Sequence, residues 1–165
     1  MKFFIKMDFI VRQGEEKDMQ SVFDLITELA VFEKEPDAVD ISVTDLINDG
    51  FSENPKFKIF VAEQENQIIG IALFYERYST WKGRTIHLED LIVTKKKQKI
   101  GAGKALYTAV LKYAFDHNYN RVAWEVIDWN QNAIDFYKST GATYLNDWSV
   151  VQMNKENLAK FIQNN

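Results

Sequence analysis

The sequence lacks cysteine altogether and contains only two histidines and two prolines among its 165 residues. Without cysteine the chain can form no disulfide framework, no thiolate metal site and no cysteine nucleophile. The two histidines, His87 and His117, stand far apart without the short spacing of metal ligands, so we expect no metal and interpret both as ordinary structural or surface residues. The absence of cysteine fits a cytoplasmic protein, which is the location that we expect.

Long apolar runs and a basic charge balance are also missing. No apolar run approaches the roughly 20 residues of a membrane-spanning helix, so we expect no membrane partner. The net charge is −4, whereas nucleic-acid-binding proteins usually carry a basic face, so we expect no nucleic-acid partner. A mildly acidic protein accommodates a cationic small substrate better than an anionic one. The hydrophobic residues that are present, 46% of the chain, are enough for a core, and we expect a single domain over 1–165.

The apolar periodicity predicts both helices and strands along the chain. We expect helices over 15–32, 42–50, 104–115, 131–139 and 154–162, and strands over 9–12, 57–63, 67–75, 85–93, 121–127 and 148–153. Ser42 and Asp45 have the spacing of a capping box at the start of the second helix, although Glu or Gln is the usual partner of the serine. Hairpins come first and a β-α-β order follows, which predicts the α+β class with a mixed, mostly antiparallel sheet flanked by helices.

The most informative segment is a strand that runs into a glycine-bearing turn and then into a helix. The strand is Leu88-Glu89-Asp90-Leu91-Ile92-Val93, and the turn is Gln98-Lys99-Ile100-Gly101-Ala102-Gly103. Backbone N–H groups converge on an anion such as a pyrophosphate at a turn of this kind. The two glycines let the main chain approach a phosphate without a Cβ between them.

The same glycines could also belong to three other kinds of turn. A plain turn between a strand and a helix is the simplest one. A dinucleotide-binding motif is disfavoured because Leu106 stands where the third glycine belongs. A Walker P-loop is disfavoured because Lys104 is followed by Ala105 and no glycine stands at the required distance upstream.

The pattern Q-x-x-G-x-G over 98–103 resembles the acyl-coenzyme A motif of the GCN5-related N-acetyltransferases (GNAT). The segments 128–130, 136–138 and 141–142 fall where that family has its second cofactor motif and its catalytic tyrosine. Further segments are similar to the spermidine/spermine acetyltransferase group: 29–34, 49–51, 78–83, 87–90 and 128–130. The segments 32–34 and 81–84 are more similar to the thialysine and diamine branch of that group. Gln98 stands where arginine is common, and Lys99 replaces a usual glycine.

The resemblance implies the GNAT fold, in which the strand that bears Glu89 and the strand that bears Val126 splay apart around the thioester arm. It also implies acetyl-CoA (coenzyme A) as the cofactor. The residues that would bind it are the end of the strand, the turn with the start of the helix, and two residues further on: Leu91, Ile92, Val93, Gln98, Lys99, Ile100, Gly101, Ala102, Gly103, Lys104, Asn130 and Ala133.

The implied reaction is direct transfer of an acetyl group to a primary amine. A lysine-like amine has a pKa of about 10.4 and must lose a proton before it attacks. Glu89 is the candidate base, with the alternative that it only anchors the substrate ammonium. Tyr137 is the candidate acid for the leaving thiolate, with the alternative that it is a core residue. Carboxylates and aromatic rings would surround a small cationic amine: Phe32, Glu33, Glu89, Trp124, Glu125, Asp147 and Trp148.

Two alternative functions and a second copy of the chain as partner also belong to the expectation. The substrate amine could belong to a protein or peptide, or the chain could be a non-catalytic acyl-CoA-binding module. Having both Glu89 and Tyr137 favours an enzyme, because a binding module needs neither. The resemblance implies a homodimer in which the segments 32–37 and 148–153 approach the partner's site.

Overall fold

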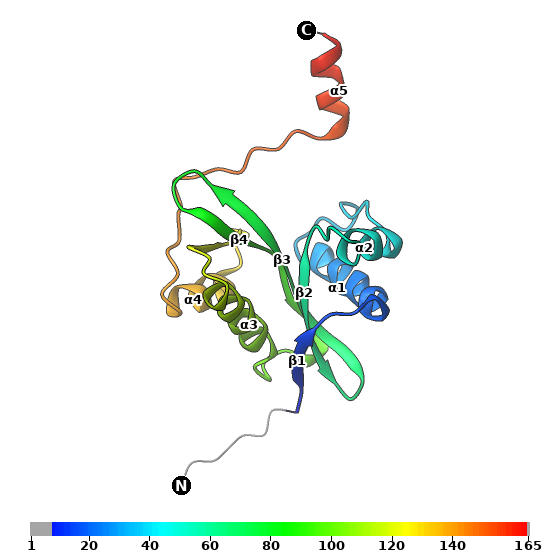
Figure 1. The fold of residues 1–165 in the computed structure, drawn as a ribbon, viewed down its shortest axis with the longest axis vertical. Helices are drawn as coiled ribbons and strands as arrows, with labels where there is room; N and C mark the ends of the chain where they lie inside the picture. Colours follow the sequence, from blue (N-terminus) through cyan, green and yellow to red (C-terminus); the bar gives the residue numbers. More distant parts are fainter. Residues whose placement is uncertain (1–7, 165) are drawn as a thin grey trace. The chain divides into compact units, whose positions relative to one another are not determined.

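A computed structural model describes residues 8–164 of the chain (Figure 1). These residues form two compact units, one that ends at Glu125 and one that begins at Val126. The second unit contains two helices, α4 (Gln131–Ser139) and α5 (Lys155–Gln163). None of the helices within 8–164 combines the length and the apolar character that crossing a membrane requires.

The first unit is built on a five-stranded sheet in the order β1-β2-β3-β4-β5. The strands are β1 (Ile10–Gln13), β2 (Lys58–Gln64), β3 (Gln67–Ser79), β4 (Gly83–Val93) and β5 (Val122–Ala123). The first four pair antiparallel, and β5 pairs parallel with β4. The expected mixed, mostly antiparallel sheet is thus confirmed.

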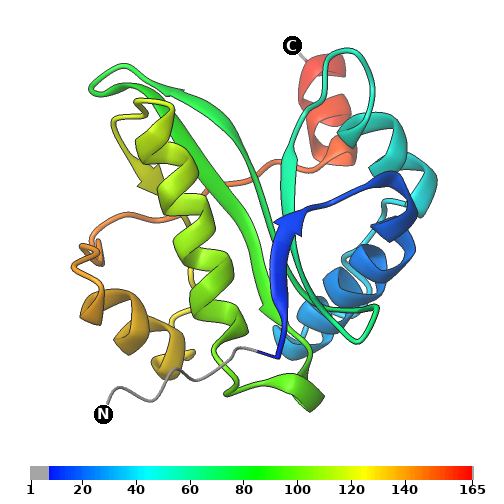
Figure 2. The same cartoon turned by 60° about the horizontal axis from the view of Figure 1, so that its bottom comes forward.

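Helices cover both faces of this sheet (Figure 2). On one face lie α1 (Met19–Phe32), preceded by the 3-10 turn η1 (Glu16–Asp18), and α2 (Val43–Gly50). On the other face lies α3 (Ala102–Asp116), which follows the 3-10 turn η2 (Lys95–Lys97). The capping box at α2 is present as expected, because Ser42 accepts from the Asp45 N–H and Asp45 accepts from the Ser42 N–H.

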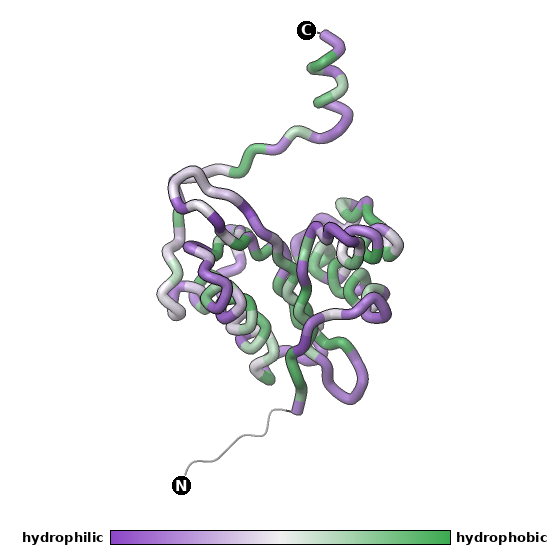
Figure 3. Tube along the Cα trace, in the orientation of Figure 1, coloured by the Kyte–Doolittle hydropathy of each residue, from purple (hydrophilic) through white to green (hydrophobic). Residues whose placement is uncertain are grey.

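The core under α1 and α2 comes from apolar side chains that alternate along the central strands. Figure 3 shows hydrophobic residues along these strands and along α1. The buried members of this core are Met19, Val22, Leu25, Leu46, Ile59, Val61, Ile71, Leu73 and Ile92. Their burial fixes which face of β4 is directed toward α1, since side chains alternate between the two faces of a strand.

Two expected strands differ in the structure. The strand expected over 121–127 is reduced to Val122–Ala123, because its pairing with β4 ends at His87 and Ala123. The strand expected over 148–153 is wrong, because this segment is irregular and its Val150, Val151 and Met153 side chains are exposed. A strand exists only where a neighbouring strand completes its hydrogen bonds, and no strand of the described chain does so here.

Candidate active site

Glu89 lies at a β-bulge in the long hairpin of β3 and β4. Leu73 is opposite Asp90 and Phe74 is opposite Leu88, so Glu89 has no residue opposite it. Such a bulge bends the strand and turns the extra side chain away from the regular ladder. On its other side, β4 pairs with β5 only as far as His87, and within 8–164 no strand continues that pairing along Leu88 to Val93. Within 8–164 the edge of β4 that faces away from β3 therefore has no strand partner from Leu88 onward, while the other edge stays paired with β3.

The Glu89 carboxylate is held at one of its two oxygens. The Tyr75 hydroxyl donates a hydrogen bond of 2.8 Å to Oε2, and Nε2 of His87 lies 3.5 Å from the same oxygen. Tyr75 and His87 are cross-strand partners with ring centroids 5.2 Å apart. The Glu89 side chain is 49% exposed. A carboxylate in this position has a fixed orientation and an accessible face, as a general base requires.

The hydroxyl of Tyr75 stays protonated under ordinary conditions. Partial burial, followed by the hydrogen bond to Glu89 and the negative charge of Glu89, raises the pKa of Tyr75 to about 12. The charge of Glu125 adds a smaller increase. Glu125, a predicted substrate residue, is therefore electrostatically coupled to the Tyr75–Glu89 pair.

Asp90 is a further carboxylate beside Glu89, and the sequence motifs do not single it out. Partial burial raises its pKa to about 6, and the charges of Glu89 and Glu33 add to the rise. Burial also raises the pKa of Glu33, which follows the last residue of α1. Among the described residues no lysine, arginine or histidine forms an ion pair with Glu33 or Asp90. The alternation of β4 was the available signal, because Asp90 occupies the core-facing row that contains Ile92.

The turn after β4 is tied to α1. The Lys95 N–H and the Thr94 hydroxyl donate to Oε1 of Glu28 at 2.8 and 3.2 Å. The side-chain amide of Gln98 donates to the carbonyl of Val93 at 3.3 Å. Lys99 and Gly101 both have left-handed backbone conformations, with φ of 68° and 91°. These contacts determine where α3 begins.

The beginning of α3 fits a pyrophosphate. No side chain caps the helix at Gly101. In the described part of the chain, the backbone N–H groups of Ala102, Gly103 and Lys104 donate no hydrogen bond. Unpaired N–H groups and the helix dipole together attract an anion. A Cβ added at Gly101 would meet nothing within 4 Å, and one at Gly103 would meet only Cγ2 of Val93 at 3.7 Å. The surface of the turn is therefore open.

The other predicted residues have more ordinary surroundings. Trp124 is partly buried and packs edge-on against Tyr107, with ring centroids 5.5 Å apart, whereas Phe32 is 50% exposed. In the second unit the Asn130 side chain caps α4 by accepting from the Ala133 N–H at 3.3 Å. Tyr137 lies in the last turn of α4 with its ring 5.4 Å from that of Phe136. Asp147 and Trp148 are exposed on the irregular segment after α4.

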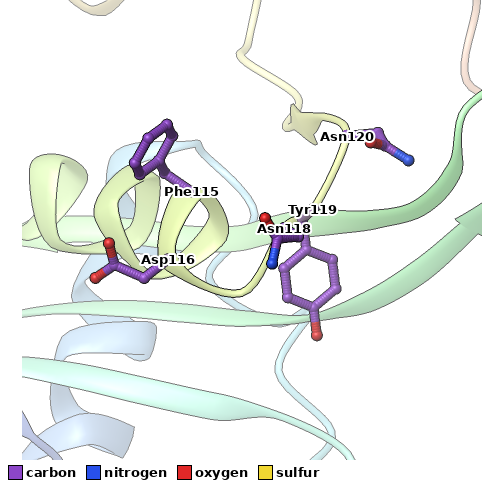
Figure 4. A pocket seen from close by; sticks show the side chains of 5 residues that line it. All are labelled: Phe115, Asp116, Asn118, Tyr119 and Asn120. Carbon is purple, nitrogen blue, oxygen red and sulfur yellow. The ribbon is translucent and has the colours of Figure 1, made fainter.

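A cavity of about 500 Å³ lies at the opposite end of α3 from this turn (Figure 4). Its lining is Phe115, Asp116, Asn118, Tyr119 and Asn120. Two of its polar groups are engaged in fixing the hairpin, since the Tyr119 hydroxyl donates to Glu76 at 2.7 Å and the Asn120 amide donates to the carbonyl of Lys82 at 2.6 Å. None of the predicted site residues lines this cavity, and we do not place the substrate in it.

Known proteins share both the sequence pattern and the fold. The Acetyltransferase (GNAT) family matches residues 19–142. The thialysine N-epsilon-acetyltransferase of Sus scrofa is 38% identical over 146 residues, which cover 84% of this chain and 86% of that protein. The spermidine/spermine N(1)-acetyltransferase-like protein 1 of Homo sapiens is 33% identical over 160 residues, which cover 91% of this chain and 23% of that protein.

Solved structures agree on the fold. An integron cassette protein from the mobile metagenome of V. cholerae has a TM-score of 0.77 at 23% identity, and the match covers 95% of this chain and 99% of that one. The chain therefore belongs to the acetyltransferase (GNAT) family, as its motifs predicted, and it is an N-acetyltransferase.

Proposed function

We propose that this enzyme transfers an acetyl group from acetyl-CoA directly to the primary amine of a small cationic substrate. The observation that carries this proposal is the cluster of three carboxylates, Glu33, Glu89 and Asp90, with which no lysine or arginine of the described chain forms an ion pair. An ammonium group is the cation that such a site lacks. The related proteins are named for thialysine and for spermidine and spermine, which are small cationic amines.

Acetyl-CoA is the proposed acetyl donor, and it supplies an activated thioester carbonyl. The open turn with the first N–H groups of α3 would hold its pyrophosphate. Backbone N–H groups of Leu91 to Val93 on the edge of β4 that faces away from β3 would donate to the thioester oxygen as charge develops on it. In the second unit Asn130 and Ala133 are the proposed further contacts to the cofactor.

In the proposed reaction the substrate nitrogen loses two protons, one to Glu89 and one to Tyr137. Glu89 takes one proton from the substrate ammonium, directly or through a water molecule, and leaves a neutral amine. The nitrogen lone pair then forms the amide bond to the acetyl carbon while the carbon–sulfur bond breaks. Tyr137 gives its proton to the leaving sulfur and regains one from the nitrogen. The products are the N-acetyl amine, free coenzyme A and the one proton that Glu89 releases to solvent.

The substrate amine would lie among carboxylates and aromatic side chains. Glu33, Asp90 and Glu125 are the proposed partners of its positive charges in the first unit, and Phe32 and Trp124 are its apolar neighbours. Asp147 and Trp148 are proposed contributors from the second unit. A protein amine remains the alternative substrate, and a panel of amines distinguishes the two.

A homodimer belongs to this proposal and comes from the resemblance. The exposed Val150, Val151 and Met153 would lie in the contact between the two copies. The charge of Glu33 adds to the raised pKa of Asp90 in the same chain, so we assign Glu33 to its own site whether or not it also approaches the partner's. Light scattering at micromolar concentration tests this, and a monomeric mass with full activity would remove the homodimer from the proposal.

The direct test of the substrate class is release of free thiol from acetyl-CoA over a panel of amines. The panel contains thialysine, lysine, ornithine, short diamines, spermidine and a lysine-containing peptide. We expect high kcat/KM for small amines that carry a second charge and low kcat/KM for the peptide. Preference for the peptide would favour the alternative, and binding of acetyl-CoA without release for any amine would favour the non-catalytic module.

A further inference from the structure

His87 is a buried side chain that the proposed chemistry has not yet used. It is 8% exposed on β4, and its ring lies against that of Tyr75 on β3. Its Nε2 is 3.5 Å from Oε2 of Glu89, whereas its Nδ1 is buried and has no hydrogen-bond partner. The two nitrogens of this ring therefore have very different surroundings.

These surroundings determine where the neutral ring carries its proton. A neutral imidazole has one N–H donor and one acceptor nitrogen. A proton on Nδ1 would be a buried donor without an acceptor, which is the more costly arrangement. A proton on Nε2 points instead toward a carboxylate oxygen. The neutral ring of His87 consequently has its proton on Nε2.

His117 provides the opposite case within the same chain. Its Nδ1 lies 2.8 Å from the carbonyl oxygen of Tyr113, one turn earlier in α3. A carbonyl oxygen only accepts, so the neutral ring of His117 has its proton on Nδ1. His117 is exposed and lies at the end of α3, apart from the residues of the site.

We propose that His87 is a positioning residue for Glu89. The Tyr75 hydroxyl donates to Oε2, and Nε2 of His87 lies 3.5 Å from the same oxygen, so both side chains face Oε2 while Oε1 stays available to the substrate amine. The distance of 3.5 Å is longer than an ordinary hydrogen bond, and in this proposal the Nε2–H donates to Oε2 in the substrate complex, because catalytic hydrogen bonds that are long in the free enzyme often shorten there. This role rests on the proposed function of Glu89 as the base.

Two substitutions of His87 distinguish a positioning role from a packing role. The side-chain amide of glutamine places an N–H near the position of Nε2, and that of asparagine places one near the position of Nδ1. We expect His87→Gln to keep kcat within a few-fold, and His87→Asn to lower kcat about 10- to 100-fold, the usual value of a hydrogen bond to a charged group. The KM for acetyl-CoA should be unchanged in both, and His117→Gln and His117→Asn serve as matched controls without effect.

Equal losses in folded His87→Gln and His87→Asn enzymes would overturn the proposal, because the ring would then matter only for packing. Full activity in both would overturn it as well. Thermal unfolding of each variant verifies that the fold is kept.

A measurement without substrate completes the test if the variants fail to fold. A long-range ¹H–¹⁵N spectrum of the wild-type enzyme reports which ring nitrogen carries the proton. We expect His87 protonated on Nε2 and His117 on Nδ1. A proton on Nδ1 of His87 overturns the positioning role even in an enzyme that acetylates amines, whereas failure to acetylate any amine overturns the proposed function whichever nitrogen is protonated.

Discussion

The Tyr75 hydroxyl donates a hydrogen bond of 2.8 Å to Glu89, the residue that the β3–β4 bulge leaves without a cross-strand partner. The bulge turns the carboxylate out of the ladder, and the tyrosine fixes the direction in which it points. Because the pKa of Tyr75 is raised to about 12, the hydroxyl remains a donor throughout the physiological pH range. The proposed base is therefore oriented before any substrate arrives.

Tyr75→Phe removes this donor without removing the ring. We expect kcat to fall about 10- to 100-fold, the usual value of a hydrogen bond to a charged group, with little change in acetyl-CoA binding. Steady-state kinetics with a saturating diamine measure the effect. Tyr78→Phe is the matched control, because Tyr78 lies on the same strand and is 74% exposed. Full activity of Tyr75→Phe would show that Glu89 needs no orientation by this residue.

Asp90→Asn should stabilise the folded protein at neutral pH. The pKa of Asp90 is raised from 3.8 to about 6, so the unfolded chain ionises this group at a lower pH than the folded protein does. Stability is consequently lost as the pH rises from about 4 to 6, and the full penalty remains above pH 6. We expect the asparagine variant to gain about 1–3 kcal/mol at pH 7 and nothing below pH 4. Urea unfolding at both pH values measures this difference.

The same carboxylate should make amine binding dependent on pH. Below pH 6 Asp90 is largely protonated, and an arriving ammonium group favours its charged form, so binding releases a proton. We expect the amine affinity to rise with pH up to about 6 and then to level off, with the dependence absent in Asp90→Asn. Calorimetry in two buffers of different ionisation enthalpy counts the released protons. No release at pH 6 would mean that the ammonium binds elsewhere.

Gly101→Val should weaken acetyl-CoA binding sharply. Gly101 has φ of 91° with open space where a Cβ would stand, so valine adds backbone strain and covers the surface on which the pyrophosphate is proposed to lie. Gly83→Val is the control, because φ there is also left-handed, at 77°, but the residue lies in the β3–β4 hairpin turn. Equal affinities for acetyl-CoA in the two folded variants would contradict the cofactor assignment.

Tyr137→Phe tests the proposed acid in the second unit. We expect turnover to fall roughly 10²- to 10⁴-fold, the usual value of a general acid, while acetyl-CoA binding stays nearly unchanged. Rapid-quench measurement of a single turnover separates this loss from slow product release. If the variant retains full turnover, another group or water protonates the thiolate.

The sequence predicted what depends on local patterns. The capping box of Ser42 and Asp45, the two-strand hairpin and the glycine turn before α3 are set by neighbouring residues, and all three are present. It failed for 148–153, because an apolar, β-branched segment becomes a strand only beside a partner that the sequence does not identify. The alternation of β4 indicates that Asp90 lies in the core-facing row, but the sequence shows neither the bulge at Glu89, which shifts the pairing of β4, nor the contact of His87 with Glu89.

The proposed reaction acetylates an amine at the expense of acetyl-CoA. Mass spectrometry of one reaction, with acetyl-CoA and a short diamine incubated with the purified enzyme, measures both products over time. We expect the N-acetyl diamine and free coenzyme A to appear in equal amounts, at a rate that requires the enzyme and that falls sharply in Glu89→Gln. Free coenzyme A without acetylated amine, or equal rates in wild type and Glu89→Gln, would contradict it.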